Sequence, residues 1–409
     1  MDSRALVTEY VRLGLRFDRL RSGYVDAYTG DPLLRRRVGN EAPPVPSELA
    51  AQARRLLAAL EDTDLAESRR RFLQVQLTAL ECAARGFAGA RIRFADEVEA
   101  YFQVRATPGD VDEYRQAHRE LDELVPGPGP LADRMAALRE RDRIPPERLE
   151  DCVRALASAL RDRVRGRFGL PPQETVGFRI VTDQPWSGFN RYLGDFRSLV
   201  AINADTGPRA ANLPHLVAHE AYPGHHTEHC RKEAGLIDRR QHLEHTISLV
   251  NTPQCLLAEG LADLGLHAAI GPGWGRWAAE ILADLGVEFD GELAERVEIA
   301  SSGLLAVRQD ALLMLHDQGA DETEVVDFLR RWLLVPERRA RHLLRFMTDP
   351  LWRAYTCTYV EGFRLLRTWL EHGPPGATSA DRYRRLLDEP LVPETIRTEI
   401  AARIPVFTR

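Results

Sequence analysis

Residues 215–229 carry the most informative pattern in the chain, and they read His215-Leu-Val-Ala-His219-Glu220-Ala-Tyr-Pro223-Gly224-His225-His226-Thr-Glu228-His229. This stretch holds five of the chain's twelve histidines, with two glutamates between them. Imidazole nitrogens are common zinc ligands, and a glutamate beside a ligating histidine can accept a proton from an attacking water. The pattern therefore predicts a zinc site in a hydrolase, with peptides or other amides as the expected substrates.

A first arrangement of ligands uses His219 and His225, with Glu220 as the general base. Zinc-binding histidines on a regular helix stand four residues apart, because they then share one face. Here position i+4 from His219 is Pro223, and His225 stands at i+6. Proline interrupts helix hydrogen bonds and glycine permits a bulge, so a break at these residues would bring His225 into place. His226 would then lie behind the ligands or face the substrate.

A second arrangement uses the same segment without a helix break. His225, Glu228 and His229 fit the inverted motif HxxEH, in which the two histidines bind the metal and the glutamate is the base. His225 belongs to both arrangements. Spacing alone leaves both of them open.

A catalytic zinc needs a third protein ligand, and Glu259 is the best candidate. Thr252 and Pro253 are typical of a helix start, and the helix that follows places Glu259 and Asp263 on one face among apolar residues. A carboxylate in such a place is paired, exposed or metal-bound. Asp263 would orient a ligating histidine. The alternative is an ordinary pair of acids on a helix surface.

Composition excludes several classes of protein. Of the 409 residues, 44% are hydrophobic and 28% are charged, as in a soluble globular protein with a sizeable core. The net charge of −6 argues against a nucleic-acid partner. Five widely spaced cysteines without a CxxC pair predict neither a disulfide framework nor a thiolate zinc site. Lys232 is the only lysine, which indicates a general bias toward arginine.

No membrane partner and a cytoplasmic location are expected. No apolar run approaches the roughly 18 residues that a membrane span requires. The first residues, Met1-Asp2-Ser3-Arg4, open an amphipathic pattern rather than an apolar signal sequence. The sequence gives no information about the oligomeric state.

The spacing of apolar residues predicts a mainly α fold. Apolar side chains recur every three or four residues in two long stripes, at Leu6, Tyr10, Leu13, Phe17 and Leu20, and at Leu149, Val153, Leu156, Leu160 and Val164. Asp321 and Glu324 form a capping box ahead of another stripe. Short apolar runs at 176–181 and 198–203 predict a small sheet beside the zinc-binding helix, joined by a polar, glycine-rich connection at 183–195.

Such a sheet could hold an extended peptide by main-chain hydrogen bonds at an edge strand, or it could be purely structural. On the first interpretation, the strand ending at Asn203 aligns the substrate, and Asn203 and Tyr192 are candidate substrate-binding residues. We expect an N-terminal helical region at 1–124 and a helical zinc-hydrolase region at 131–409. The Pro/Gly segment 125–130 is interpreted as a loop within one integrated domain.

Several motifs together resemble one bacterial family, the domain of unknown function 885. The motif His219-Glu-Ala-Tyr-Pro-Gly-His225-His226 is similar to that family's signature. Further similar stretches are Pro185-Trp186, Tyr192-Leu-Gly-Asp-Phe-Arg-Ser198, Ile202-Asn203, Glu259-Gly-Leu-Ala262 and Tyr359-Val-Glu-Gly362. The resemblance covers roughly residues 100 to 370, whereas the first hundred residues are similar only in being helical.

That family is similar in arrangement to the gluzincin metallopeptidases, including the thimet-oligopeptidase-like group. The resemblance implies a large helical metallopeptidase-like fold and one zinc ion per chain, bound by His219, His225 and Glu259. It also implies that Tyr359, with Tyr355 as the alternative, stabilises the oxyanion. The step from family to peptidase is an analogy. The rival hypotheses are a metal-dependent small-molecule amidase or biosynthetic tailoring enzyme, and an inert helical binding protein on the same scaffold.

Overall fold

The structure is a computed structural model that describes residues 1–184 and 186–403, so Pro185 of the motifs above lies outside the described residues. The helices of the N-terminal half are α1 (Ser3–Leu20), α2 (Pro32–Gly39), α3 (Pro46–Leu60), α4 (Glu67–Phe87), α5 (Phe94–Phe102), α6 (Val111–Leu124), α7 (Leu131–Arg141), α8 (Pro146–Arg167) and α9 (Leu213–Glu220). A short 3₁₀ turn, η1 (Ala204–Thr206), precedes α9.

The helices that follow are α10 (His225–Lys232), α11 (Pro253–Asp263), α12 (Gly265–Ala269), α13 (Trp274–Ala283), α14 (Gly291–Ser301), α15 (Val307–His316), α16 (Glu322–Leu333), α17 (Glu337–Thr348), α18 (Phe363–Glu371), α19 (Ser379–Asp388) and α20 (Pro393–Ala401). Between them lie the π-helices η2 (Glu233–Asp238) and η5 (Thr358–Gly362) and the 3₁₀ turns η3 (Leu243–Thr246) and η4 (Ser302–Leu304). The prediction of a mainly α fold with small sheets is therefore confirmed.

The helices predicted from sequence begin where their capping residues stand. The first apolar stripe is the buried face of α1, whose N-terminus is capped by the Asp2 side chain. The second stripe is the buried face of α8, which starts directly after Pro145. Helix α16 starts with the predicted capping box, because Asp321 and Glu324 bind each other's backbone N–H groups.

The small sheet has three strands, β2 (Thr175–Val181), β3 (Gly188–Gly194) and β4 (Arg197–Asn203), in the order β2-β4-β3. Strand β4 is parallel to β2 and antiparallel to β3. The prediction of a glycine-rich connection between two strands was wrong over residues 188–194, which form β3. Polar Asn190 and Tyr192 alternate with exposed residues on this strand and point into the protein, so an apolar run does not mark it.

A second, two-stranded sheet joins distant parts of the chain. Strand β1 (Val25–Tyr28) pairs antiparallel with β5 (Ile247–Leu249). The pairing shifts between Val25 and Ala27, which leaves Asp26 as the extra residue of a β-bulge.

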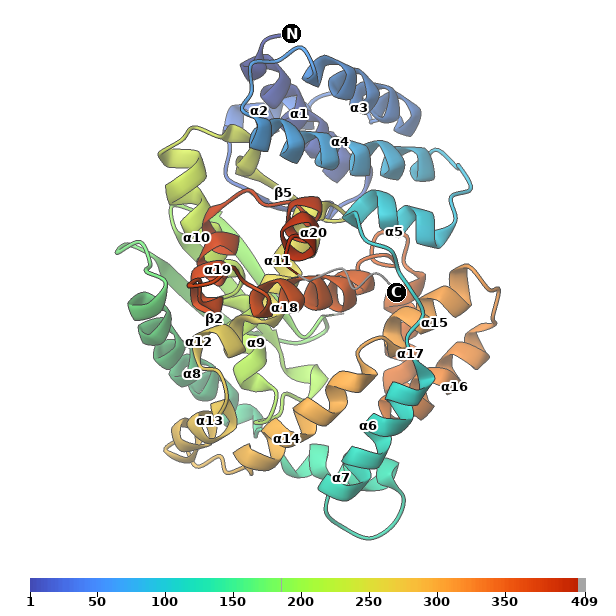
Figure 1. The fold of residues 1–409 in the computed structure, drawn as a ribbon, viewed down its shortest axis with the longest axis vertical. Helices are drawn as coiled ribbons and strands as arrows, with labels where there is room; N and C mark the ends of the chain where they lie inside the picture. The colour runs from blue at the N-terminus through green and yellow to red at the C-terminus, as the bar shows by residue number, and fades with distance from the viewer. Residues whose placement is uncertain (185, 404–409) are drawn as a thin grey trace.

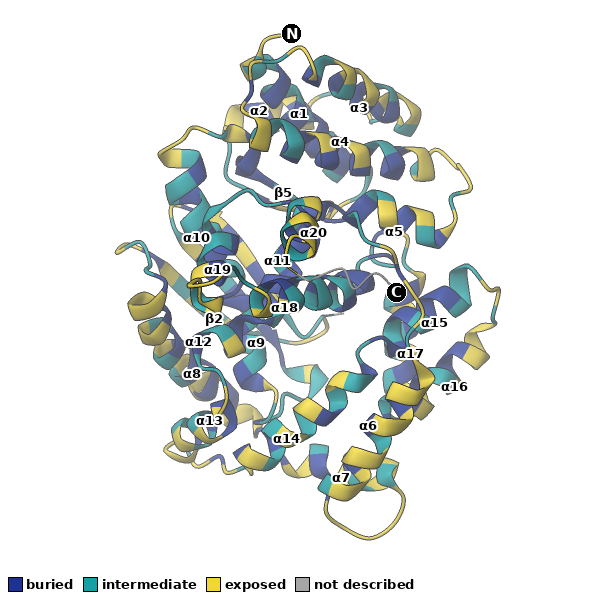
Figure 2. Cartoon of the chain, viewed as in Figure 1, coloured by how far each residue is buried: buried dark blue, intermediate teal, exposed yellow. Residues whose placement is uncertain are grey.

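Two hydrophobic cores meet at helix α11. The first core combines helices α1–α7 with α15, α16 and α17. The second core combines α8, α9, α13, α18 and α19 with the three-stranded sheet. Helix α11 gives Leu256 to the first core, and Leu257 and Leu261 to the second. In Figure 1 helices α1–α4 form the top of the molecule, and α18–α20 cross its centre near α11. Figure 2 shows that buried residues concentrate at this centre while the outer helices keep exposed faces.

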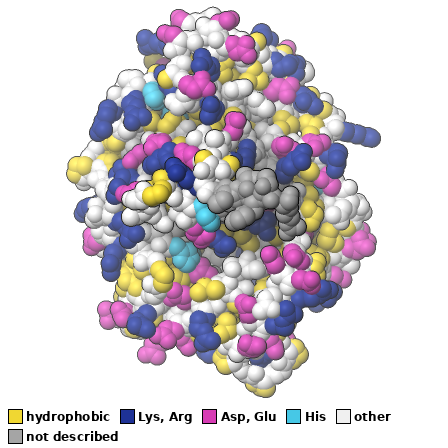
Figure 3. Space-filling view, viewed as in Figure 1, with side chains coloured by type: hydrophobic (Ala, Val, Ile, Leu, Met, Phe, Trp, Pro, Cys, Tyr) yellow, Lys and Arg dark blue, Asp and Glu magenta, His cyan; other side chains and the backbone are white. Residues whose placement is uncertain are grey.

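The Pro/Gly segment 125–130 links α6 to α7, and Leu121 before it and Met135 after it belong to the same core. None of the described helices combines the length and the apolar character that crossing a membrane requires. In Figure 3 positive and negative side chains are interspersed over the visible face, and histidine side chains reach the surface near its centre.

Candidate metal centre

The predicted helix break is present between α9 and α10. Helix α9 ends at Glu220 and α10 begins at His225, so that the two histidines lie on different helices. The Gly224 amide donates a hydrogen bond back to the Ala218 carbonyl oxygen at 2.9 Å. A Cβ atom at position 224 would lie 1.9 Å from the His219 carbonyl oxygen. Only glycine therefore fits at this reversal, which turns His225 toward His219.

Three donor groups converge as the first arrangement predicts. The Nε2 atoms of His219 and His225 are 3.2 Å apart. Glu259 Oε2 lies 3.4 Å from His219 Nε2, and Glu259 Oε1 lies 3.2 Å from His225 Nε2. Zinc with bonds of 2.0–2.2 Å in a tetrahedral arrangement holds its ligands about 3.3 Å apart. The observed separations fit that geometry.

Glu259 and Asp263 reach the site from one face of α11, a helix capped by the Thr252 hydroxyl. Asp263 Oδ1 is 2.9 Å from His219 Nδ1, which directs Nε2 of that ring toward Glu259. This is the orienting contact predicted from spacing. Glu259 Oε2 is buried and, within the described part of the chain, accepts no hydrogen bond. A buried, unsatisfied carboxylate oxygen beside two imidazole nitrogens is the donor set that a cation completes.

The charges at the site favour a cation. Burial alone would raise the pKa of Glu259, but His225 and His219 outweigh it and lower that pKa. Burial alone would also lower the pKa of His225, yet the Glu259 carboxylate raises it to about 9. The carboxylates of Glu259 and Asp263 thus favour positive charge at the two imidazoles, which a metal ion would supply.

Glu220, the last residue of α9, lies next to these ligands and keeps its carboxylate free. Its backbone carbonyl oxygen accepts a hydrogen bond from Asn190 Nδ2 at 2.6 Å, but its side chain has no hydrogen-bond partner among the described residues. Burial raises the pKa of Glu220. A Cβ atom at Gly188 of β3 would lie only 2.8 Å from Glu220 Oε1, so this glycine makes room for the carboxylate.

The two tyrosines predicted near the site have different surroundings. The Tyr355 hydroxyl donates a hydrogen bond to Glu259 Oε1 at 2.8 Å and so positions that ligand. Tyr359 lies on the π-helix η5, and its ring centre is 6.4 Å from that of His219. In the described part of the chain its hydroxyl has no hydrogen-bond partner. Tyr355 is therefore the tyrosine that the structure ties to the convergent donor groups by a hydrogen bond.

The HxxEH arrangement is not assembled. Glu228 forms an ion pair with Lys232, and both side chains are largely buried. The His229 ring stacks on Tyr192 with ring centres 4.6 Å apart. Neither residue belongs to the convergent donor groups found among the described residues. His225, Glu228 and His229 keep their spacing on the regular helix α10, so the difference lies in their partners: Lys232 binds Glu228, Tyr192 stacks on His229, and His225 meets His219 and Glu259.

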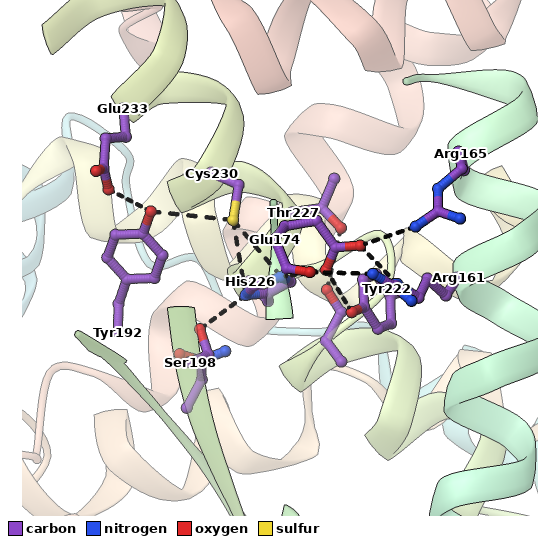
Figure 4. A network of polar contacts seen from close by, with 12 residues as sticks. Arg161, Arg165, Glu174, Tyr192, Ser198, Tyr222, His226, Thr227, Cys230 and Glu233 are labelled. Atoms are coloured by element: carbon purple, nitrogen blue, oxygen red, sulfur yellow. Dashed lines mark hydrogen bonds and ion pairs between the residues drawn. The ribbon is translucent and has the colours of Figure 1, made fainter. Parts of the chain in front are cut away.

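His226 lies behind the ligands rather than toward the substrate, in the buried polar network drawn in Figure 4. Its Nδ1 atom is 2.8 Å from Ser198 Oγ, and its Nε2 atom is 3.1 Å from Glu174 Oε2. Glu174 also accepts hydrogen bonds from Tyr222 at 2.7 Å and Arg161 at 2.5 Å. The network ties the helix break to α8 and to β4. Sequence reasoning missed Glu174, because one glutamate in a loop has no recognisable signal.

The interpretation of β4 as an edge strand that could hold an extended substrate was wrong. Strand β4 is the central strand, so its neighbours already use its backbone hydrogen bonds. The Asn203 side chain donates to the carbonyl oxygens of Gln184 and Trp186, and thus holds the loop before β3. The buried Tyr192 hydroxyl donates to Glu233 and is not offered to a substrate. The edge strand that borders the site is β3, through the contact of Asn190 with Glu220.

A cavity opens beside Glu259 and His225, lined also by Asp26, Lys232, Cys255 and Tyr355. The bulge in β1 aims the Asp26 carboxylate at this cavity, where it has no hydrogen-bond partner among the described residues. Asp26 is itself an exposed residue. Sequence reasoning missed this residue, since a single aspartate in a four-residue strand carries no signal.

Arg308 was missed as well. It lies at the start of α15, within electrostatic reach of Tyr359 and Asp263, and burial lowers the pKa of its guanidinium group. No ion pair of Arg308 occurs within residues 1–184 and 186–403. Asp26 and Arg308 thus place one unpaired charge of each sign near the convergent ligands.

Comparison with known proteins defines the fold and leaves the family as a prediction. No protein-family model matches the chain, and no curated protein matches it. Two solved structures are similar, each with a TM-score of 0.52. One is a "putative lipoprotein" from Colwellia psychrerythraea, 14% identical, in a match that covers 88% of this chain and 67% of the other. The second, a "putative lipoprotein of unknown function" from Shewanella oneidensis, is 13% identical, with 96% and 82% covered. Identity this low establishes a shared fold alone.

Proposed function

We propose that the protein is a zinc-dependent hydrolase, and most specifically a metallopeptidase that cleaves peptide or other amide bonds. The observation that carries the proposal is the convergence of His219, His225 and Glu259 at mutual distances of 3.2 to 3.4 Å, with one buried carboxylate oxygen left unsatisfied. The free carboxylate of Glu220 next to these ligands supports a hydrolytic function rather than a purely structural site.

A bound zinc ion would act as a Lewis acid toward the amide carbonyl and would lower the pKa of a water molecule. Glu220 accepts the proton of the attacking water and returns it to the leaving amine. The Tyr359 hydroxyl donates a hydrogen bond to the carbonyl oxygen as negative charge develops on it. Asp263 and Tyr355 hold His219 and Glu259 in position.

The test combines metal content with cleavage of a peptide library. The wild-type protein should bind zinc at this centre and cleave peptides. Glu220→Gln should retain the metal and lose about 10²–10⁴-fold in rate, the usual contribution of a general base. Glu228→Gln is the matched control, because Glu228 is the base of the arrangement that the structure does not assemble. A Glu220→Gln protein with full activity would refute the assignment of the base.

The same measurements separate the rival functions. Zinc binding without cleavage of any library peptide would favour a small-molecule amidase or a biosynthetic tailoring enzyme. A folded protein that takes up no metal would favour the inert binding protein. The resemblance to the domain of unknown function 885 family supports the peptidase among these. Cell fractionation decides between the predicted cytoplasmic location and the membrane attachment that the neighbours' names suggest.

A further inference from the structure

A second group of metal-binding residues lies away from the first. It consists of His215 on α9, His267 on α12 and Glu298 on α14, whose donor atoms all lie within 4.8 Å of one another. Glu298 Oε1 is 3.1 Å from His215 Nε2 and 3.2 Å from His267 Nε2. Two imidazole nitrogens from different helices therefore approach the same carboxylate oxygen, at separations close to the ligand distances of a zinc site.

The polar atoms of this group are left incompletely satisfied. His215 Nε2 is buried and makes no correctly directed hydrogen bond, although Glu298 is close. Glu298 Oε2 is buried as well and has no partner within the described part of the chain. The first centre shows the same feature at Glu259 Oε2. The buried Trp274 packs its ring edge-on to His215, with ring centres 4.7 Å apart, and so closes one side of the group.

A third histidine-rich group provides a contrast. His242, Glu244 and His245 also lie close together, but Arg69 already binds both carboxylate oxygens of Glu244, at 2.6 and 2.7 Å. A metal ion there would have to displace a charged, bidentate partner. No arginine competes for Glu298 in this way, because the partners of Glu298 among the described residues are His215 and His267.

We propose that His215, His267 and Glu298 form a second binding site for a divalent transition-metal ion, with zinc as the first candidate. Two imidazoles and one carboxylate suit zinc, iron or manganese. The side chains are between 23% and 39% exposed, so the ion can enter from solvent and retain open positions for water. The site does not depend on the proposed hydrolase function, because the two centres share no ligand.

The position of the second site suggests a structural role. His215 precedes His219 by four residues on α9, so the two histidines are about 6 Å apart along the helix axis. An ion bound by all three residues would link α14 and α12 to the helix that carries His219 and Glu220.

The test is zinc stoichiometry of the full-length protein, measured by elemental analysis after equilibrium dialysis against buffered zinc. The variants are His267→Ala and Glu298→Gln for the second site, His225→Ala for the first, and the double variant His225→Ala/His267→Ala. Glu298→Gln keeps the size of the side chain and its ability to accept hydrogen bonds. His372→Ala, at an exposed histidine outside the three groups, is the control. Circular dichroism verifies that each variant is folded.

The wild type should bind two zinc ions, each single-site variant one, and the double variant none. His372→Ala should bind two. One zinc ion in the wild type, lost in His225→Ala and retained in His267→Ala and Glu298→Gln, would overturn the second site and leave the proposed function intact. One zinc ion lost only in the second-site variants would support this inference and refute the first centre.

Discussion

Gly260 sits where two backbones touch, and Gly260→Ala tests whether that contact builds the site. Helix α11, which carries Glu259, packs against η5, which carries Tyr359, through Gly260 and Gly362. A Cβ atom at position 260 would lie 2.6 Å from the carbonyl carbon and oxygen of Gly362. Ordinary contact begins near 3.4 Å, so the two segments would have to separate by about 0.8 Å.

The magnitude follows from two opposing effects. Replacing glycine by alanine inside a helix stabilises it by about 0.5–1 kcal/mol. Forcing extra volume into a packed interface costs about 1–3 kcal/mol, and the upper end applies here because the neighbour is backbone rather than a movable side chain. We therefore expect Gly260→Ala to lower the free energy of unfolding by about 2 kcal/mol. Zinc affinity should fall too, because Glu259 moves with the helix.

Urea unfolding in the presence of a chelator measures the change in stability without a contribution from metal binding. Gly166→Ala in α8 is the matched control, since a Cβ atom there meets nothing within 4 Å. The control should be as stable as the wild type or more stable, and should bind zinc normally. Gly260→Ala with the stability of Gly166→Ala would show that the close approach does not constrain the site.

Three further predictions concern charged side chains. Glu174→Gln should lower the free energy of unfolding by about 3 kcal/mol at pH 7, as expected for breaking a buried ion pair. His226, Tyr222 and Arg161 outweigh burial and lower the pKa of Glu174. The loss of stability should therefore shrink as the pH of the unfolding experiment falls below 4.5, the ordinary pKa of a glutamate. Asp263→Asn should weaken zinc binding about 10–100-fold in a competition titration, because the contact that orients His219 is weakened; unchanged affinity would exclude that role. Asp26→Asn should reduce kcat/KM more for peptides with a cationic group near the scissile bond than for neutral peptides. Arg308→Gln should reduce kcat/KM more for peptides with a carboxylate near that bond than for neutral peptides. An equal reduction for neutral peptides would contradict both predictions.

Local features of the sequence determined the helices and part of the site. Helix α1, helix α8 and the capping box of α16 follow from residues within a few positions of one another, so periodicity and capping predict them. The helix break is local too, because Pro223 and Gly224 leave the chain no regular helix. Asp263 was predicted beside a ligating histidine from its position on the same helix face as Glu259.

Tertiary packing decided the rest. The pairing of His225 with His219, rather than with His229, depends on tertiary packing, which stacks His229 on Tyr192 of β3 and brings Glu259 of α11 beside His225. The edge strand β3 has polar inward-facing residues, and β1 pairs with a segment more than 200 residues away, so neither follows from a local pattern. The group of His215, His267 and Glu298 exists only because three helices bring single residues together. Periodicity specifies which face of a helix is buried, whereas the partner of that face depends on contacts between segments distant in sequence.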